Sequence, residues 1–150
     1  MEELPNCIGI DVGSRRIGVA VHPPGMTQAL PFETVEVSKK DDRKALRRLA
    51  EICKARDISV LVVGWPVDMD GIARRATKRV DTLIEGLSAI IEEAGQPCEV
   101  VRWDERLTTT SAEAMLIEAD LSRARRKQVV DKIAAAHILE GYLNSRRHGP

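Results

Sequence analysis

The sequence predicts one α/β domain in which helices flank a five-stranded mixed sheet. Three observations predict it: an alternating hairpin near the N-terminus, two apolar runs further along, and helical periodicity before each of those runs. Short turns join antiparallel strands, whereas strands joined through a helix pair in parallel. We therefore expect three antiparallel strands followed by two parallel ones, in a single domain over residues 1–150.

The first hairpin spans residues 7–21. Asp11 stands at the end of an apolar run, and a turn containing Gly13 follows. The next strand alternates small residues with the apolar residues Ile17, Val19 and Val21. Burying a lone carboxylate costs several kcal/mol, so Asp11 needs a partner. It either accepts hydrogen bonds from the amides of the turn or serves a metal or phosphate site.

The hairpin runs to about His22, and a third strand is expected from Ala29 to Val37. A helix follows, with an apolar stripe made of Ala45, Leu46, Leu49, Ile52 and Cys53. The continuous apolar run from Ile58 to Val63 is typical of a strand covered on both faces. We expect it to end at Gly64-Trp65-Pro66, a sequence that does not favour a sheet.

The second half of the chain continues this order. A loop from Val67 to Gly71 with two aspartates precedes a long helix, which ends near Gly95 and Pro97. A fifth strand, Glu99 to Trp103, is followed by a helix with a capping box at Thr110 and Glu113. Residues 123–127 are expected to form a basic loop, Asp131 to begin the last helix, and residues 146–150 to form a frayed tail.

The composition limits the possible functions. Lys plus Arg and Asp plus Glu both number 23, so no global positive field indicates a polyanion partner. The three cysteines are far apart and odd in number, which fits neither a disulfide framework nor a zinc site. The three histidines are isolated, and none is taken as a ligand. Without a long apolar run or a leader, the chain is expected to be soluble and cytoplasmic.

Acidic residues stand at three expected element ends: Asp11, the pair Asp104 and Glu105, and Asp131. Each has a structural alternative, since Asp131 suits the first turn of a helix, Glu105 suits an ion pair with a neighbouring arginine, and Asp104 suits a turn cap. Ligands of open α/β sheets gather at the carboxyl ends of strands. Together these carboxylates predict a site for Mg²⁺ or Mn²⁺, which could support phosphodiester hydrolysis.

Basic residues lie next to each acidic position, as phosphate binding around a metal requires. The candidates for nucleic-acid binding are Arg15, Arg16, Arg106, Arg123, Arg125, Arg126 and Lys127. Trp65 and Trp103 are open to two interpretations, because they either stack bases or pack within the domain.

Four segments of the chain resemble the YqgF/RuvX family of bacterial pre-16S rRNA nucleases, which are also described as Holliday junction resolvases. They are residues 9–20, residues 63–71, the run Asp104-Glu105-Arg106-Leu107-Thr108-Thr109, and residues 130–143. The resemblance implies an RNase H-like fold and a metal-dependent endonuclease acting on structured nucleic acid. By motif position, the resemblance implies that Asp11, Glu105 and Asp131 are the catalytic acidic residues, with Asp104 beside Glu105. Trp65 and Ser14 differ from the residues usual in the family, but neither is one of these acidic positions.

The resemblance leaves two substrates open, the 5′ end of precursor 16S rRNA and a four-way DNA junction. We favour the rRNA, because the sequence shows no dimer face for symmetric junction cutting and has no net charge. A monomer and a homodimer both stay possible. A non-catalytic nucleic-acid-binding module is a further alternative, and a sugar-kinase-like phosphate loop is disfavoured because the chain has room for one domain only.

Overall fold

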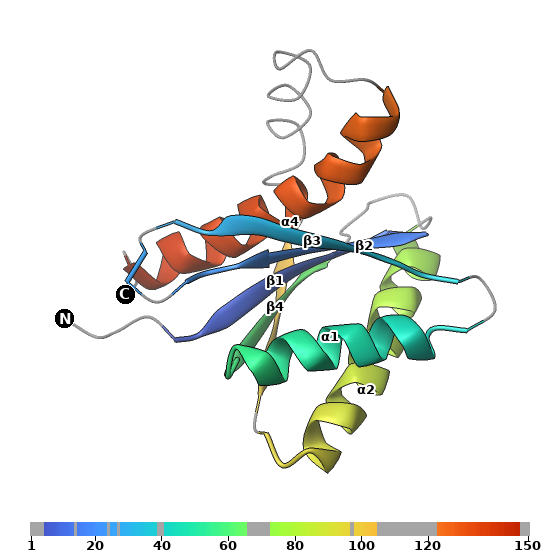
Figure 1. The fold of residues 1–150 in the computed structure, drawn as a ribbon, viewed down its shortest axis with the longest axis horizontal. Helices are drawn as coiled ribbons and strands as arrows, with labels where there is room; N and C mark the ends of the chain where they lie inside the picture. Colours follow the sequence, from blue (N-terminus) through green and yellow to red (C-terminus); the bar gives the residue numbers. More distant parts are fainter. Residues whose placement is uncertain are drawn as a thin grey trace.

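The structure, a computed structural model, describes residues 5–13, 15–23, 25–26, 28–38, 41–65, 73–96, 98–104 and 123–147. The elements, labelled as in Figure 1, are β1 (Cys7–Val12), β2 (Arg16–Val21), β3 (Leu30–Glu36), α1 (Arg43–Ala55), β4 (Val60–Trp65), α2 (Ala73–Glu93), β5 (Glu99–Asp104) and α4 (Arg123–Arg147). Among them, no helix combines the length and the apolar character that a membrane span requires.

The five strands form one mixed sheet in the order β3-β2-β1-β4-β5. Strands β1, β2 and β3 pair antiparallel, while β4 joins β1 in parallel and β5 joins β4 in parallel. The carboxyl ends of β1, β4 and β5 therefore lie at one end of the sheet, where β1 turns into β2. The predicted fold class and strand directions are confirmed.

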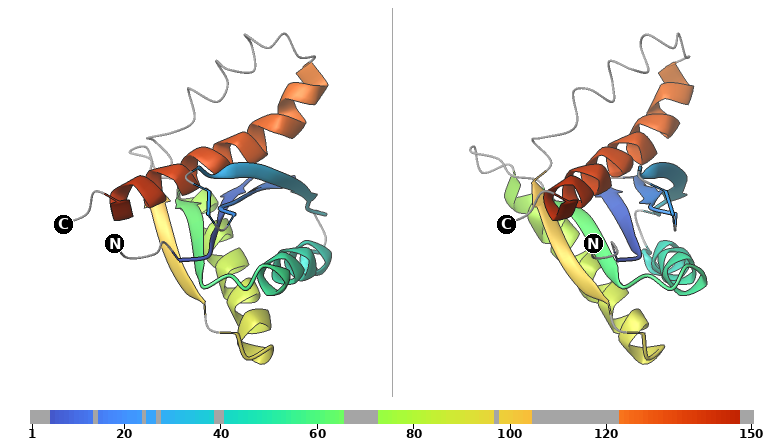
Figure 2. Two further views of the ribbon diagram at one scale, coloured as in Figure 1. Left: turned by 60° about the vertical axis from the view of Figure 1, so that its left-hand side comes forward. Right: turned by 90° about the vertical axis from the view of Figure 1, so that its left-hand side faces the viewer.

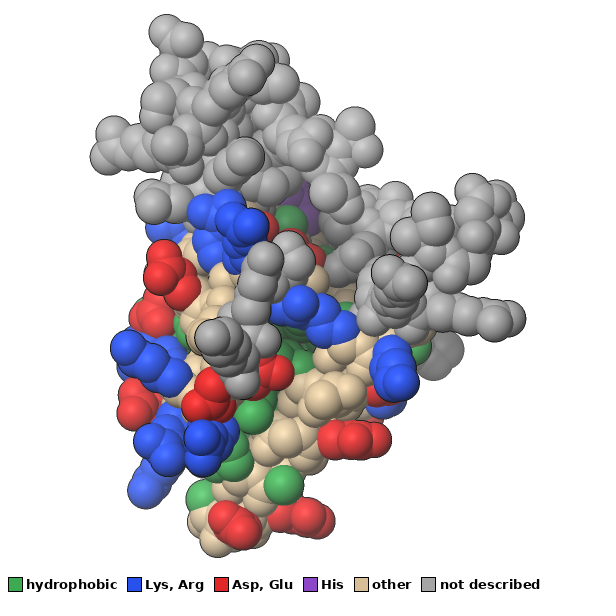
Figure 3. Space-filling view, turned by 90° about the vertical axis from the view of Figure 1, so that its right-hand side faces the viewer, with side chains coloured by type: hydrophobic (Ala, Val, Ile, Leu, Met, Phe, Trp, Pro, Cys, Tyr) green, Lys and Arg blue, Asp and Glu red, His purple; other side chains and the backbone are tan. Residues whose placement is uncertain are grey.

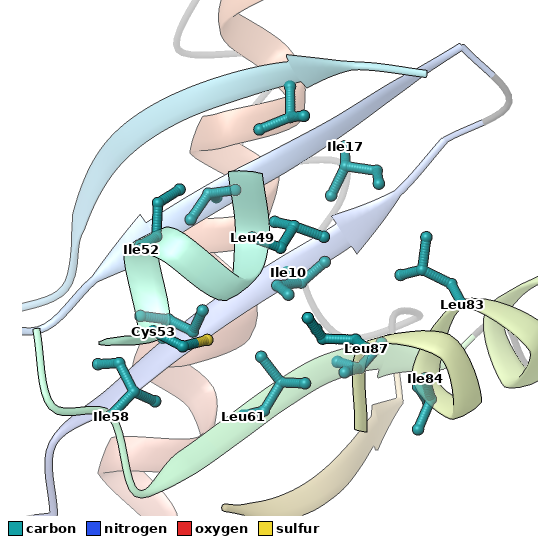
Figure 4. Packing of buried hydrophobic residues seen from close by; sticks show 14 of the residues in the cluster. Ile10, Ile17, Leu49, Ile52, Cys53, Ile58, Leu61, Leu83, Ile84 and Leu87 are labelled. Atoms are coloured by element: carbon teal, nitrogen blue, oxygen red, sulfur yellow. The ribbon is translucent and has the colours of Figure 1, made fainter. Parts of the chain in front are cut away.

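The two faces of the sheet are covered differently (Figure 2). One face packs on α1 and α2, and Ile8 and Val19 belong to that core cluster. Figure 4 shows Ile10 and Ile17 meeting Leu49 and Leu87 in the same layer. The other face packs on α4, through Cys7, Ala20, Val60 and Val62 against Ala135, Ile138 and Leu139. Because side chains alternate along a strand, each strand residue belongs to one layer or the other.

Helix α4 lies close to the sheet because glycines stand beneath it. A Cβ atom added to Gly9 would come within 2.6 Å of the Ala135 carbonyl oxygen and 2.8 Å of the Leu139 Cβ. A Cβ atom added to Gly18 would overlap the carbonyl group of Asp131. These two strand glycines bring the helix backbone, and Asp131 with it, down onto β1 and β2.

Three of the expected element limits are wrong. Strand β4 continues through Gly64 and Trp65, because these residues pair with Trp103 and Asp104 of β5 and so keep a hydrogen-bonding neighbour. Residues 123–127 are not a loop but the first turns of α4, in agreement with the helix propensity of Arg, Ala and Lys. The same helix extends to Arg147, so the frayed tail is shorter than expected.

The position of Asp131 changes accordingly. It stands in the third turn of α4 and not at the start of a helix, so the helix dipole does not explain its presence. The expected loop of residues 67–71 and the expected helix around Thr110 and Glu113 lie outside the described residues.

Candidate functional site

Asp11 and Asp131 come together on the α4 side of the sheet. Asp11 shares a strand face with Cys7 and Gly9, which lie under α4, and its partner across the hairpin is Gly18. The backbone of Asp131 lies directly over Gly18. Two carboxylates from opposite ends of the chain therefore lie near enough where β1 ends for their charges to interact.

The negative charges of Asp11 and Asp131 repel each other, and Arg16 offsets them in part. Burial, followed by the negative charge of Asp11, raises the pKa of Asp131, and Arg16 opposes the rise. The Arg16 Nε atom lies 3.4 Å from the Asp131 Oδ2 atom, and the Asp131 side chain is 22% exposed. A pair of carboxylates that disfavours its own ionised state fits a divalent cation, because Mg²⁺ and Mn²⁺ prefer anionic oxygen ligands.

This repulsion predicts how stability responds to Asp131→Asn in the absence of metal. A raised folded-state pKa means that Asp131 weakens the fold as pH rises and the carboxyl ionises. At pH 7 with chelator, the variant is expected to melt about 2 °C above the parent protein. The difference should vanish in acid, where the parent carboxyl is protonated. Asp81→Asn is the control, since Asp81 pairs with Arg102 on the other face. A lower Tm for Asp131→Asn than for the parent would contradict the repulsion.

Of the two remaining acidic candidates, Asp104 is described, and it stands at the end of β5. Alternation puts Asp104 on the same side as Arg102, which stacks on Trp65 and pairs with Asp81 of α2 at 3.0 Å. Asp104 thus lies on the sheet face opposite to Asp11. Glu105 and Arg106 lie outside the described residues. Within the part of the chain that is described, no group of three His, Cys, Asp or Glu residues forms a metal site.

The predicted basic residues fall into two groups. Arg16 opens β2 next to Asp131, and Arg15 directly precedes it. With Glu36 and Val37 the two arginines line a hollow of about 340 Å³. Residues 123–127 lie on α4 before Asp131. Seen from the end of the sheet, positive and negative side chains are interleaved on the visible surface, which agrees with the neutral net charge (Figure 3).

Both tryptophans pack within the domain. Arg102 lies over the Trp65 ring, 5.1 Å from its centroid, and Trp65 also packs against the core between the sheet, α1 and α2. Trp103 lies 6.4 Å from the Tyr142 ring and against Gly141 of α4. These contacts favour the packing interpretation over base stacking for both residues.

Sequence reasoning missed Gly9, Gly18 and Glu36 as parts of this site. The signal for the glycines was present, because small residues alternate with apolar ones along both strands of the first hairpin. Glu36 carries no such signal, since it reaches the site only through its pairing with Arg16 across the β2–β3 ladder.

Comparisons with known proteins find a matching family and similar relatives. The family model RuvX, described as Holliday junction resolvase, matches residues 5–145. A protein of Halalkalibacterium halodurans named "Putative pre-16S rRNA nuclease" is 40% identical over 93% of this chain and 96% of its own length. A protein of Shouchella clausii with the same name is 39% identical over 94% of this chain and 96% of its own length.

Similar solved structures share the fold. The Thermus thermophilus protein RuvC, solved in complex with a Holliday junction substrate, matches with a TM-score of 0.61 at 18% identity over 96% of each chain. The yeast mitochondrial Holliday junction resolvase Ydc2 matches with a TM-score of 0.52 at 13% identity, over 95% of this chain and 80% of its own. The mixed five-stranded sheet is therefore an RNase H-like fold, which these two structures share.

Proposed function

This chain belongs to the RuvX family, and on that premise we propose that it is a divalent-metal-dependent endonuclease that hydrolyses phosphodiester bonds in structured nucleic acid. The observation that carries the proposal is the convergence of Asp11 and Asp131 at the end of β1, with Arg16 beside them. The fold alone would not establish an activity, but a repelling carboxylate pair in a nuclease family supports one.

The proposed metal ligands are Asp11, Asp131 and Glu105. Glu105 is preferred to its neighbour because Asp104 lies on the face of the sheet opposite to Asp11. When bound, Mg²⁺ or Mn²⁺ activates water and stabilises the leaving oxygen of the cleaved phosphodiester. Both Mg²⁺ and Mn²⁺ are hard ions, and both suit a site made only of carboxylate oxygens.

The protein's own residues hold and orient the substrate backbone. Arg16 carries a guanidinium group beside Asp131, so a phosphate next to the carboxylates would meet a positive charge and hydrogen-bond donors. Arg15 adds a second guanidinium group at the same end of β2. We assign further backbone contacts to Arg106 and to the basic first turns of α4, Arg123, Arg125, Arg126 and Lys127.

Precursor 16S rRNA, cut at its 5′ end, is the proposed substrate. The names of the two relatives above support it, since both align over nearly their whole length. This assigns the activity to the cytoplasm, where bacterial rRNA is made. The alternative is a four-way DNA junction, as named for the family model and for the structural neighbours. Junction resolution would require a two-fold dimer so that both strands are cut symmetrically.

The test compares a labelled precursor-16S leader with a labelled four-way DNA junction. Each is incubated with the purified protein in Mg²⁺, in Mn²⁺ or in chelator. We expect metal-dependent cutting of the leader at its 5′ side and at least tenfold slower cutting of the junction. Preferential cutting of the junction would select the alternative. Binding of both substrates without cutting in either metal would instead support a non-catalytic module.

A further inference from the structure

The hollow beside Arg16 has a composition that phosphate binding alone does not explain. Its lining residues are Arg15, Arg16, Glu36 and Val37, around a volume of about 340 Å³. Arg15 and Glu36 are exposed, and Arg16 is half-buried. The volume lies within the range of small-ligand pockets, roughly 300–1,000 Å³, and suits one sugar–phosphate unit of a strand.

The hollow adjoins the carboxylate pair through Arg16. On one side, the Arg16 Nε atom lies 3.4 Å from Asp131. On the other side, Glu36 is the partner of Arg16 across β2 and β3, and paired residues project from the same face. A strand bound with one phosphate at the carboxylates therefore presents a neighbouring sugar–phosphate unit to this hollow.

The two kinds of side chain demand different partners. Guanidinium groups only donate hydrogen bonds, and a backbone phosphate accepts them. The Glu36 carboxylate only accepts hydrogen bonds, so it suits a part of the bound strand that donates one and not the phosphate itself. A deoxyribose–phosphate backbone contains no donor, whereas each ribose carries a 2′-hydroxyl group that donates. Of the two backbones, only that of RNA therefore offers both an acceptor for the arginines and a donor for the glutamate.

We propose that this hollow is a ribonucleotide subsite, in which Arg15 and Arg16 bind a backbone phosphate and Glu36 accepts a hydrogen bond from an adjacent ribose 2′-hydroxyl. The subsite selects RNA over DNA at one nucleotide near the cleaved bond. It rests on the proposed function, since it needs a strand lying across Asp11 and Asp131.

The larger hollow next to it does not compete for this role. It has a volume of about 580 Å³ and lies between β3 and the first three turns of α1. In this hollow, the Arg48 guanidinium group already donates hydrogen bonds to the Glu33 carboxylate, at 2.6 and 2.7 Å, and to the Glu51 carboxylate, at 3.3 Å. The lining as a whole carries four carboxylates against three cations, so it offers a phosphate no net positive charge, and we assign no ligand there.

The test is a scan of single 2′-deoxy substitutions along a cleavable RNA, with kcat/KM measured for each substrate. With the parent protein we expect one position, within a few nucleotides of the cut, at which the substitution lowers kcat/KM about tenfold. Glu36→Ala should lower kcat/KM on all-RNA by a similar factor and lose the sensitivity at that position. Glu36→Gln keeps an acceptor oxygen and should keep the sensitivity. Glu85→Ala, on exposed α2 surface, is the matched control.

Two results would overturn the subsite. One is a 2′-deoxy profile that is the same in Glu36→Ala as in the parent protein, while cutting still requires metal and Asp11. That outcome leaves the nuclease proposal standing and removes only the role of Glu36. The other is an inability of the parent protein to bind or cut any RNA, which overturns the subsite together with the rRNA substrate.

Discussion

Asp11→Asn is expected to reduce phosphodiester cleavage at least about a thousandfold while leaving the fold intact. The carboxylate is an anionic oxygen ligand at the centre of the proposed metal site, and an amide of the same shape supplies no charge. Losing about 4 kcal/mol of transition-state stabilisation corresponds to this factor. Because the change also relieves the repulsion of Asp131, the metal-free variant should be no less stable than the parent protein. Single-turnover cleavage and thermal melting in chelator measure the two effects.

The neighbouring acidic residues provide the controls for this experiment. Glu105→Gln and Asp131→Asn should lower cleavage by a comparable factor, since all three ligands serve one site. Asp104→Asn should retain activity within about tenfold, because Asp104 lies on the other face of the sheet. Full loss in Asp104→Asn with activity kept in Glu105→Gln would reverse the assignment at the end of β5. Activity kept in Asp11→Asn would refute the metal site itself.

Gly18→Ala is expected to lower the melting temperature by about 10 °C and to abolish cleavage in the fraction that stays folded. The added Cβ atom would overlap the carbonyl group of Asp131 and would lie 2.7 Å from the Lys132 nitrogen. Backbone atoms in a helix cannot rotate aside, so α4 must move away from β2 as a unit. Overpacking of this kind costs about 3 kcal/mol, and the displacement takes Asp131 away from Asp11. Thermal melting, together with cleavage below the lowered Tm, measures both consequences.

Alanine variants at two further glycines distinguish an effect on stability from an effect on the position of Asp131. Gly9→Ala also presses on α4, at the Ala135 carbonyl oxygen, but one turn beyond Asp131. It should lower Tm while retaining more activity than Gly18→Ala. Gly86→Ala lies on the opposite face, where the nearest atoms to its Cβ belong to the flexible side chain of Leu46, with Cδ1 at 2.9 Å. There we expect an unchanged or higher Tm, because alanine favours a helix. Equal activity in Gly9→Ala and Gly18→Ala would contradict a positional role for Gly18.

The pattern along the chain predicted the strands and their directions because it depends on local physics. Alternation with period two and apolar runs identified all five strands, and the connection lengths separated antiparallel from parallel pairing. The same pattern predicted that Asp11 stands at a strand end. It was wrong about the start of α4, where consecutive basic residues resemble a loop in composition but favour a helix in propensity.

The sequence by itself determined the fold class and the strand directions, and it supplied the acidic residues that we propose for the site. Only the tertiary structure decided which of those residues meet. Asp11 and Asp131 share a face because strand alternation turns Asp11 toward α4 and because Gly18 leaves room for the helix backbone. Asp104 is turned to the other face by the same alternation. Such choices depend on packing between distant segments, and a one-dimensional pattern contains no information on how closely a helix approaches a sheet.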